Sequence, residues 1–212
     1  MAKQILVIGL GTFGGMVARE LARLGHEVLG CDHDPVIVAA LAPELTDAVE
    51  LDATDEAAIR AIGPGDFDVA VVALDRHTTV FTTMILEQIG VRSIVARALT
   101  ELDGEILRRV GADRVLRTDE LIATWVARTI DLSGALDFIR LEGGISAVHM
   151  QIPERAVGQT VGAVMAARPG LTVAAVHRGD QVIADPSPET ALLEGDTALL
   201  VGPEETFRSL AE

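Results

Sequence analysis

Short apolar runs alternate with segments of helical periodicity through the first two thirds of the chain. Continuous apolar runs of this kind are typical of strands that are buried on both faces of a sheet. They predict strands at residues 5–8, 28–31, 48–51, 69–74, 94–96 and 115–116. The helical segments that follow them are residues 13–24, 35–41, 56–62, 78–89, 102–110 and 120–131. This βα alternation predicts an α/β fold with a Rossmann-like, doubly wound parallel sheet.

The pattern changes after about residue 133. The stretch LDFIRLEGGISAVHMQIPE predicts two strands around Gly143-Gly144, and LTVAAVHRGDQVIADP predicts a hairpin around Gly179-Asp180. The stretch GDTALLVGPEE adds a last strand, and residues 206–211 have the pattern of a short helix. We therefore expect a nucleotide-binding domain at residues 1–133 and a small α+β C-terminal domain at residues 134–212, with a hinge at Ser133-Gly134.

Three glycines follow the first predicted strand in the stretch ILVIGLGTFGG, at Gly9, Gly11 and Gly14. A lone GxGxxG occurs by chance, but here a strand precedes the glycines and a helix follows them. Gly9 would permit the tight turn, Gly11 would let a phosphate approach the backbone, and Gly14 would let the helix pack on the strand. The context favours a nucleotide site over a purely structural turn.

The second predicted strand ends at Asp32, in HEVLGCDHD. A carboxylate at this place accepts hydrogen bonds from ribose hydroxyls and disfavours a 2′-phosphate, so it disfavours NADP. His33 would then lie beside the ribose or the base. The alternative is a solvated Asp32 that opens the next turn.

Further candidates follow the later strands, because ligands of open α/β sheets bind at the carboxyl ends of the strands. Thr54 or Asp55 could instead serve as the N-cap of the next helix, a role that both residue types favour. Arg97 ends an apolar strand on the ligand side and could reach a terminal phosphate. The candidates at these carboxyl ends are Asp52, Ala53, Thr54, Ala73, Leu74 and Arg97.

Composition narrows the function classes. The formal net charge is −15 and 49% of the residues are hydrophobic, which argues against a surface for nucleic acid or for direct binding of anionic lipid. No apolar run approaches the roughly 20 residues of a membrane helix. Cys31 is the single cysteine, so an internal disulfide is impossible and a reducing cytoplasm is the expected location.

The inventory of catalytic groups is small. The chain has no tyrosine and Lys3 is its one lysine, which excludes a catalytic tyrosine or a Schiff-base lysine deep in a site. His77, His149 and His177 stand in no recognisable catalytic constellation, and no spacing resembles a zinc or EF-hand site. We therefore expect a protein that is not an enzyme.

At this point a family resemblance becomes visible. The stretches VIGLGTFGGMVARELARLGHEVLGCDHD, LDATDEAAI, VVAL, VRSIVARA and ILRRVGADRVLRTDELIATWVARTI closely resemble the regulator-of-potassium-conductance (RCK) family, the Ktr and Trk A-type subunits of potassium uptake systems. The tail from residue 145 onward resembles the small C-terminal regulatory domain of that family. The GAD element at residues 111–113, together with this tail, is more specific than the glycine motif.

The resemblance implies a cytoplasmic, nucleotide-sensing gating subunit, peripheral to the inner face of the cell membrane through its partner. Such subunits form dimers and an octameric ring beneath a membrane-embedded potassium channel or transporter. ATP or ADP is the implied ligand, and some relatives bind NAD(H). Carried over to this chain, the implied nucleotide site comprises Gly9, Gly11, Thr12, Phe13, Gly14, Asp32, His33, Asp52, Ala53, Thr54, Ala73, Leu74 and Arg97.

Three departures from the family pattern concern ligands. Thr12 stands where ATP-responsive members commonly carry an arginine. Asp119 or Glu120 stands where the family has a glutamate near a divalent cation at the phosphates, with helix capping as the alternative. Residues 161–168 match a region that binds cyclic di-AMP in some members, but here they are largely apolar, which favours a dimer core.

Two other functions remain open at this stage. One is an NAD-dependent oxidoreductase, against which the missing tyrosine and the small tail argue. The other is a sensor attached to a different cation transporter, such as a cation/proton antiporter.

Overall fold

The computed structural model describes residues 2–211. The chain forms two compact units, Met1–Asp119 and Glu120–Glu212. This division lies within the first turn of the helix at Thr118–Asp131, whereas the sequence pattern placed the domain limit after that helix, at Ser133-Gly134. Among the described residues, no helix combines the length and the hydrophobicity that a membrane crossing requires.

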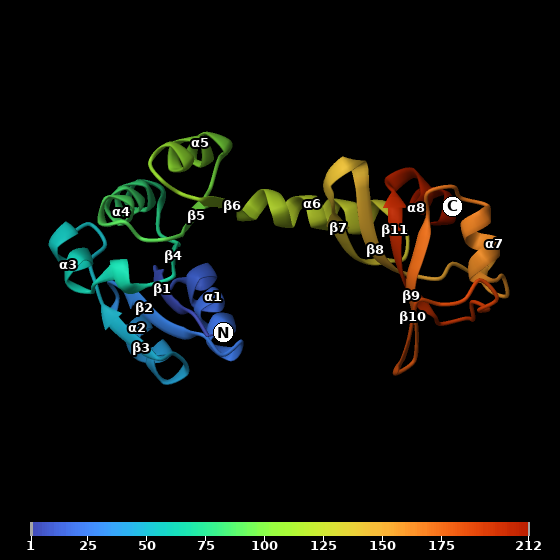
Figure 1. Ribbon diagram of the computed structural model, residues 1–212, viewed down its shortest axis with the longest axis horizontal. Coiled ribbons are helices and arrows are strands. Elements are labelled where there is room, and N and C mark those ends of the chain that lie inside the picture. The colour runs from blue at the N-terminus through green and yellow to red at the C-terminus, as the bar shows by residue number, and fades with distance from the viewer. Residues whose placement is uncertain (1, 212) are drawn as a thin grey trace. The chain divides into compact units, whose positions relative to one another are not determined.

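The first unit is a six-stranded sheet with the order β3-β2-β1-β4-β5-β6, and every pair of neighbours is parallel (Figure 1). Its strands are β1 (Gln4–Ile8), β2 (Glu27–Asp32), β3 (Asp47–Glu50), β4 (Val69–Val72), β5 (Ile94–Ala98) and β6 (Arg114–Arg117). Its helices are α1 (Thr12–Arg23), α2 (Pro35–Leu41), α3 (Glu56–Ala61), α4 (Arg76–Ile89) and α5 (Glu101–Arg109). The predicted doubly wound sheet is confirmed.

Strand β1 is buried on both faces, as its unbroken apolar run predicts. Leu6 and Ile8 pack into the core that includes Ile59 and Leu86, while Ile5 and Val7 pack into a second core on the other face. The sheet therefore separates two apolar layers, each closed by helices. The order in which successive strands are added reverses between β1 and β4, and in such sheets a crevice forms there at the carboxyl ends of the strands.

The GAD element has a structural role at the start of β6. Gly111 has a φ of 108°, and a Cβ there would lie 2.3 Å from Cγ of Glu87, so the position requires glycine. The Asp113 carboxylate accepts a hydrogen bond from the backbone N–H of Ile94 at 2.7 Å, and its own N–H donates to the Ile94 carbonyl at 3.0 Å. These two bonds fix the register in which β6 joins β5.

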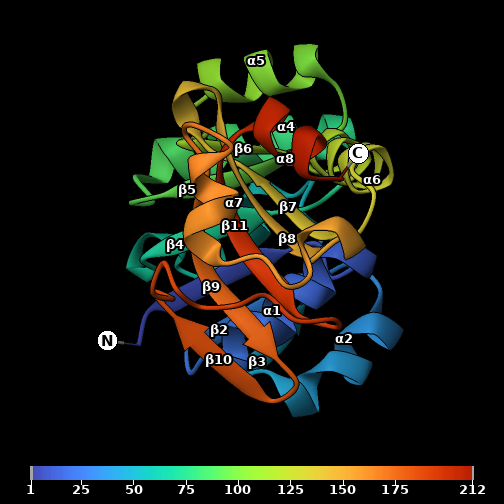
Figure 2. The same cartoon turned by 90° about the vertical axis from the view of Figure 1, so that its right-hand side faces the viewer.

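The second unit is a five-stranded antiparallel sheet with the order β10-β9-β11-β8-β7 (Figure 2). Its strands are β7 (Ala135–Arg140), β8 (Ile145–Gln151), β9 (Thr172–Arg178), β10 (Gln181–Ala184) and β11 (Thr197–Pro203). Its helices are α6 (Thr118–Asp131), which begins at the last residues of the first unit, α7 (Val161–Ala166) and α8 (Glu204–Ala211). The predicted small α+β domain is confirmed, including its β9–β10 hairpin.

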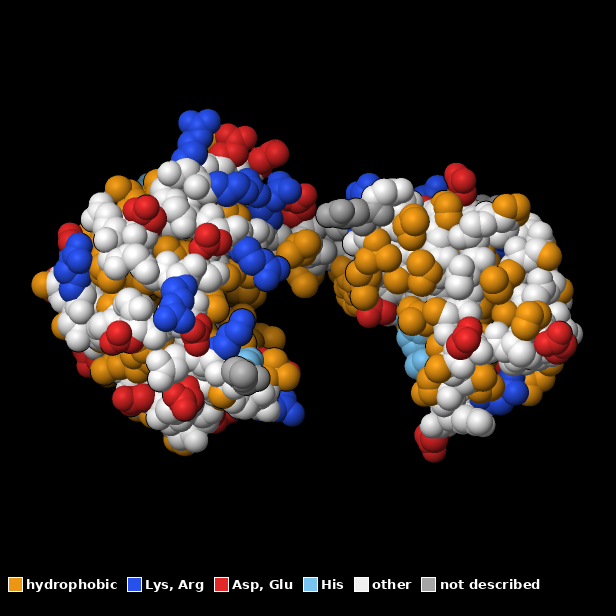
Figure 3. Space-filling model, viewed as in Figure 1, with side chains coloured by type: hydrophobic (Ala, Val, Ile, Leu, Met, Phe, Trp, Pro, Cys, Tyr) orange, Lys and Arg blue, Asp and Glu red, His pale blue; other side chains and the backbone are white. Residues whose placement is uncertain are grey.

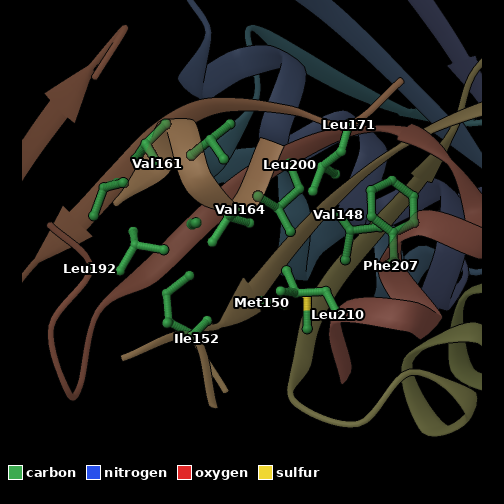
Figure 4. Packing of buried hydrophobic residues seen from close by; sticks show 14 of the residues in the cluster. Val148, Met150, Ile152, Val161, Val164, Leu171, Leu192, Leu200, Phe207 and Leu210 are labelled. Atoms are coloured by element: carbon green, nitrogen blue, oxygen red, sulfur yellow. The ribbon is translucent and has the colours of Figure 1, made fainter. Parts of the chain in front are cut away.

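One face of this sheet is covered by α7 and α8 (Figure 4). Phe207 and Leu210 of α8 pack against Val148 and Met150 of β8 in a single apolar core. Val161 and Val164 of α7 are buried in the same core. The expectation that residues 161–168 form a dimer core is therefore wrong for these two valines, because their own unit already covers them.

Candidate functional site

A hollow of about 630 Å³ lies at the carboxyl ends of the strands of the first unit. This is the crevice where the strand order reverses between β1 and β4, and where open α/β sheets bind their ligands. It is lined by Ile8, Gly9, Gly11, Cys31, Asp32, His33, Ile37, Leu51, Asp52, Ala53, Thr54, Ala73, Leu74, Asp75, Thr78, Arg97 and Leu99.

The three glycines of the first loop are required for three different reasons. Gly9 has a φ of 94°, and a Cβ there would lie 2.6 Å from the Ala73 carbonyl oxygen, so the turn passes directly against the end of β4. A Cβ at Gly14 would lie 1.8 Å from the Gly9 carbonyl oxygen, so α1 packs directly on the loop. A Cβ at Gly11 would meet no heavy atom within 4 Å and would stand in the open hollow. The space beside Gly11 is therefore not filled by other parts of the protein and is open to a ligand.

Asp32 ties the glycine loop to the end of β2. Its side chain is buried, and its carboxylate accepts hydrogen bonds from the backbone N–H of Leu10 at 2.6 Å and of Asp34 at 3.0 Å. Nδ1 of His33 lies 3.1 Å from the same carboxylate, and the His33 side chain is exposed. Asp32 is thus held rigidly at the wall of the hollow, at the place where a ribose-binding carboxylate stands in this fold.

Two aspartates at the ends of β3 and β4 are each paired with a threonine. The Asp52 carboxylate accepts a hydrogen bond from the Thr54 hydroxyl at 2.7 Å, and the Asp75 carboxylate accepts one from the Thr78 hydroxyl at 2.6 Å. These hydrogen bonds hold the pKa values of both aspartates below their usual range. Asp75 also caps α4 by accepting from the His77 and Thr78 N–H groups.

Arg97 supplies the guanidinium of the hollow. It lies 5.4 Å above the Phe13 ring, in a cation–π arrangement, and its Nε donates a hydrogen bond to the Thr118 hydroxyl at 3.1 Å. Its Nη2 is 3.9 Å from the Asp119 carboxylate. Arg97 is thus held by these contacts while it lines the hollow.

The structure brings ten of the predicted nucleotide-site residues to this one hollow. They are Gly9, Gly11, Asp32, His33, Asp52, Ala53, Thr54, Ala73, Leu74 and Arg97. Gly14 is buried and packs against the loop, and the half-buried Phe13 packs against Arg97. Thr12 is exposed at the first position of α1 and does not line the hollow.

Sequence reasoning missed several lining residues. Thr78 lies in the first turn of α4, and its Asp-x-x-Thr spacing from the cap residue Asp75 was the signal that could have found it. Ile37 of α2 and Leu99 line the hollow because of where their backbone passes, and no local pattern marks them.

Asp119 was the candidate for a divalent cation, together with Glu120. The Asp119 carboxylate lies 3.9 Å from the Arg97 guanidinium, and Glu120 is the next residue of the same helix, α6. Over residues 2–211, no three His, Cys, Asp or Glu side chains are grouped so that they could hold a metal ion. The divalent cation therefore stays a prediction.

The histidines of the second unit lie together on its sheet. The His149 and His177 rings are 5.1 Å apart between centroids, and Nε2 of His149 lies 2.7 Å from the Thr197 hydroxyl. His149 and Thr197 thus satisfy each other within the sheet.

Comparison with known proteins agrees with both units. The TrkA-N domain matches residues 5–118, and the TrkA-C domain matches residues 148–212. Ktr system potassium uptake protein C of Bacillus subtilis (strain 168) is 30% identical over 205 residues, which cover 95% of this chain and 93% of that protein. Ktr system potassium uptake protein A of the same organism is 30% identical over 204 residues, or 94% of this chain and 91% of that protein.

Solved structures of GsuK share the fold. The crystal structure of the GsuK RCK domain superimposes with a TM-score of 0.69 at 18% identity over the whole of this chain, which spans 47% of the GsuK chain. A GsuK channel bound to NAD gives a TM-score of 0.54 at 24% identity, covering 98% of this chain and 38% of that one. GsuK bound to ADP gives a TM-score of 0.53 at 26% identity over 61% of this chain and 34% of that one.

The predicted resemblance is confirmed along nearly the whole length, from the glycine loop of the first unit to the antiparallel sheet of the second. The chain belongs to the TrkA-N/TrkA-C family of potassium uptake proteins.

Proposed function

We propose that this protein is the nucleotide-sensing regulatory subunit of a potassium uptake system, and that the nucleotide binds in the hollow at the carboxyl ends of β1–β5. The observation that carries the proposal is the combination of an open Gly11, a rigid Asp32 and a positioned Arg97 around one hollow. The similar proteins of Bacillus subtilis are named Ktr system potassium uptake proteins, which supports the assignment of this subunit to a potassium uptake system.

The ligand is an adenine nucleotide, with ATP or ADP expected from the family. A structure of GsuK bound to ADP and another bound to NAD support the nucleotide class for the same fold. The α1 N–H groups and Arg97 would hold the phosphates, and Asp32 would accept from the ribose. Thr12 carries no charge. Among the residues that line the described hollow, Arg97 would therefore supply the positive charge for the terminal phosphates.

Regulation follows if the nucleotide binds one conformation of the assembly better than another. A ligand shifts such an equilibrium by its difference in affinity for the two states, and the membrane partner responds to the shift. No step in this cycle requires bond chemistry on the nucleotide. The subunit would act at the cytoplasmic face of the membrane through its partner, a potassium channel or transporter.

Self-association, first to dimers and then to an octameric ring, is supported by unpartnered apolar surface. Figure 3 shows hydrophobic side chains gathered on the visible face of the second unit. Helix α6 buries none of its residues and exposes an apolar stripe at helical spacing. The members of this stripe are Leu121, Ile122, Trp125, Val126 and Ile130.

The proposal is tested by calorimetry with ATP, ADP, NAD and NADH on the full chain. Asp32→Ala should weaken binding of the preferred nucleotide by at least about tenfold, because a ribose contact and the anchor of the glycine loop are both lost. Asp66→Ala is the matched control, since Asp66 is exposed and lines a different hollow at the opposite edge of the sheet. If Asp32→Ala binds as tightly as the wild type, the site assignment is wrong.

A second measurement separates sensing from catalysis. The protein should leave NADH unoxidised in the presence of a panel of carbonyl compounds. Steady turnover in that assay would instead favour an oxidoreductase.

A further inference from the structure

Two histidines of the second unit lie on the same face of its sheet. Successive residues of a strand point to opposite faces, and Val148 and Val176 are fully buried in the core beneath α7 and α8. Their neighbours His149 of β8 and His177 of β9 therefore project from the other face, and both side chains are half-buried. Figure 3 shows histidine side chains at the surface of the second unit, so small ions can reach this histidine pair.

The spacing of the histidine pair fits two ligands of one metal ion. The ring centroids are 5.1 Å apart and the ring planes meet at 45°. A zinc–imidazole bond is about 2.0 Å long and the bonded nitrogen lies about 1.1 Å from its ring centroid, so two imidazoles at a tetrahedral angle on one ion have centroids about 5 Å apart. The last side-chain torsion of histidine is broad, so the nitrogens can turn toward a shared ion while the strands stay in place.

Thr197 orients one of the two rings. It stands on β11, which lies between β8 and β9 in the sheet, and its hydroxyl oxygen is 2.7 Å from Nε2 of His149. When Nε2 carries the proton and donates it in this hydrogen bond, the lone pair of Nδ1 is free for a metal ion. Metal-binding histidines commonly donate their second ring N–H to an oxygen in this way, which fixes the ring and raises its basicity. Thr197 is thus a positioning residue for the histidine pair.

The surroundings of the histidine pair favour a cation. Asp137 of β7 is the register partner of His149, so it stands on the same face and adds negative charge there. Its carboxylate accepts a hydrogen bond from the Trp125 indole at 2.8 Å. Within residues 2–211, no third His, Cys, Asp or Glu is grouped with the pair so that it could share an ion. An ion held here would therefore take two ligands from the protein and the others from water.

We propose that His149 and His177 form a site for a divalent transition-metal ion such as Zn²⁺, which they bind through one imidazole nitrogen each. Imidazole suits zinc, copper and nickel, whereas Mg²⁺ and Ca²⁺ prefer oxygen ligands. The histidine pair belongs to the second unit and the nucleotide hollow to the first, so the site does not depend on the proposed function. A bound ion would join β8 to β9 across β11 and stabilise the second unit.

The experiment titrates Zn²⁺ into the full chain by calorimetry, without nucleotide and in a buffer that does not bind metals. Two ligands supply about half the binding free energy of a four-ligand site, so the Kd should lie between about 1 and 100 µM. Mg²⁺ in about hundredfold excess should change this Kd by less than about twofold. His149→Gln and His177→Gln should each weaken zinc binding by at least about tenfold.

Two further comparisons separate the metal site from general effects on the fold. His26→Gln is the matched control, because His26 belongs to the first unit, and this variant should bind Zn²⁺ as the wild type does. Thr197→Val should weaken zinc binding by about tenfold, and Thr197→Ser, which keeps the hydroxyl, should restore it.

Thermal unfolding shows whether each variant keeps its fold. The electron paramagnetic resonance spectrum of Cu²⁺ bound to the wild type tests the same site without any substitution, because it should show coupling to two imidazole nitrogens. Zinc binding that is absent in the expected range would overturn the inference, as would unchanged binding in a folded His149→Gln or His177→Gln variant. A copper spectrum with coupling to one imidazole nitrogen or to none would also overturn it.

Discussion

Gly11 and Gly14 are three residues apart in one motif, yet the structure predicts opposite effects of the same substitution. A methyl group at Gly14 would lie 1.8 Å from the Gly9 carbonyl oxygen, whereas carbon–oxygen contacts are ordinarily about 3.3 Å or more. A methyl group at Gly11 would touch nothing within 4 Å. Gly14→Ala should therefore damage folding, and Gly11→Ala should damage binding.

The size of the folding effect follows from the overlap. Helix α1 or the loop must move by about 1.5 Å, and forced overpacking of this kind costs about 3 kcal/mol. Replacing glycine by alanine within a helix stabilises it by about 1 kcal/mol, so the free energy of unfolding should fall by about 2 kcal/mol in all. For a unit of this size the melting temperature should fall by about 8 °C.

Gly11→Ala should melt within about 3 °C of the wild type, because the small loss at an N-cap is offset by a less flexible unfolded chain. Its methyl group occupies the space through which a phosphate approaches the α1 N–H groups. Losing charge-assisted hydrogen bonds to that phosphate should weaken nucleotide binding by between about tenfold and a hundredfold.

Scanning calorimetry and isothermal titration of the two variants check the prediction side by side. Normal nucleotide affinity in Gly11→Ala would refute the placement of the phosphates. Wild-type melting of Gly14→Ala would refute the packing argument.

Three further predictions concern other parts of the chain. Burial, helped by Asp47 and Asp32, raises the pKa of the Cys31 thiol to about 12, so at pH 8 Cys31 should react with a disulfide reagent about a thousandfold more slowly in the folded chain than in urea. The hydrogen bonds from Arg178 hold the pKa of the buried Asp196 carboxyl below its usual range. A lowered pKa stabilises the folded state at pH values above the pKa of the unfolded chain, and this stabilisation is lost as acid protonates the carboxylate. The melting temperature of the second unit should therefore fall progressively below about pH 4. Asp196→Asn should flatten that acid slope, and an unchanged slope would contradict the assignment. Ile130→Glu, at an exposed position of the α6 stripe, should leave melting within about 2 °C of the wild type but lower the mass seen by light scattering; an unchanged mass would remove α6 from the interface.

The order of elements in the first unit was predictable from the sequence for a physical reason. Strands buried on both faces must be continuously apolar, and a βα alternation leaves few topologies other than a doubly wound sheet. The start of α4 shows the limit of the pattern: apolar periodicity begins at Thr78, but Asp75 caps the helix and starts it at Arg76. Hydrogen bonds, which leave no periodicity, decided that boundary.

The C-terminal part shows a second limit. An apolar segment such as residues 161–168 must be covered, but the sequence does not say by what. Val161 and Val164 of α7 are covered by other residues of their own unit. The apolar stripe of α6 is not covered in this way, because none of the residues of α6 is buried. Whether an apolar face belongs to a core or to an interface depends on which elements pack against it.

The sequence by itself determined the fold class, the two-part organisation and most of the residues that line the hollow, because the glycine spacing and the ends of apolar strands are local features that a parallel sheet brings to one edge. Tertiary structure alone decided which of those residues face the hollow. It buried Gly14 against Gly9, left Gly11 open, and set Phe13 beneath Arg97. It also brought Thr54 and Thr78, from segments that follow different strands, to the same hollow. Such contacts join residues that are far apart in the sequence, so they are known only once the chain has folded.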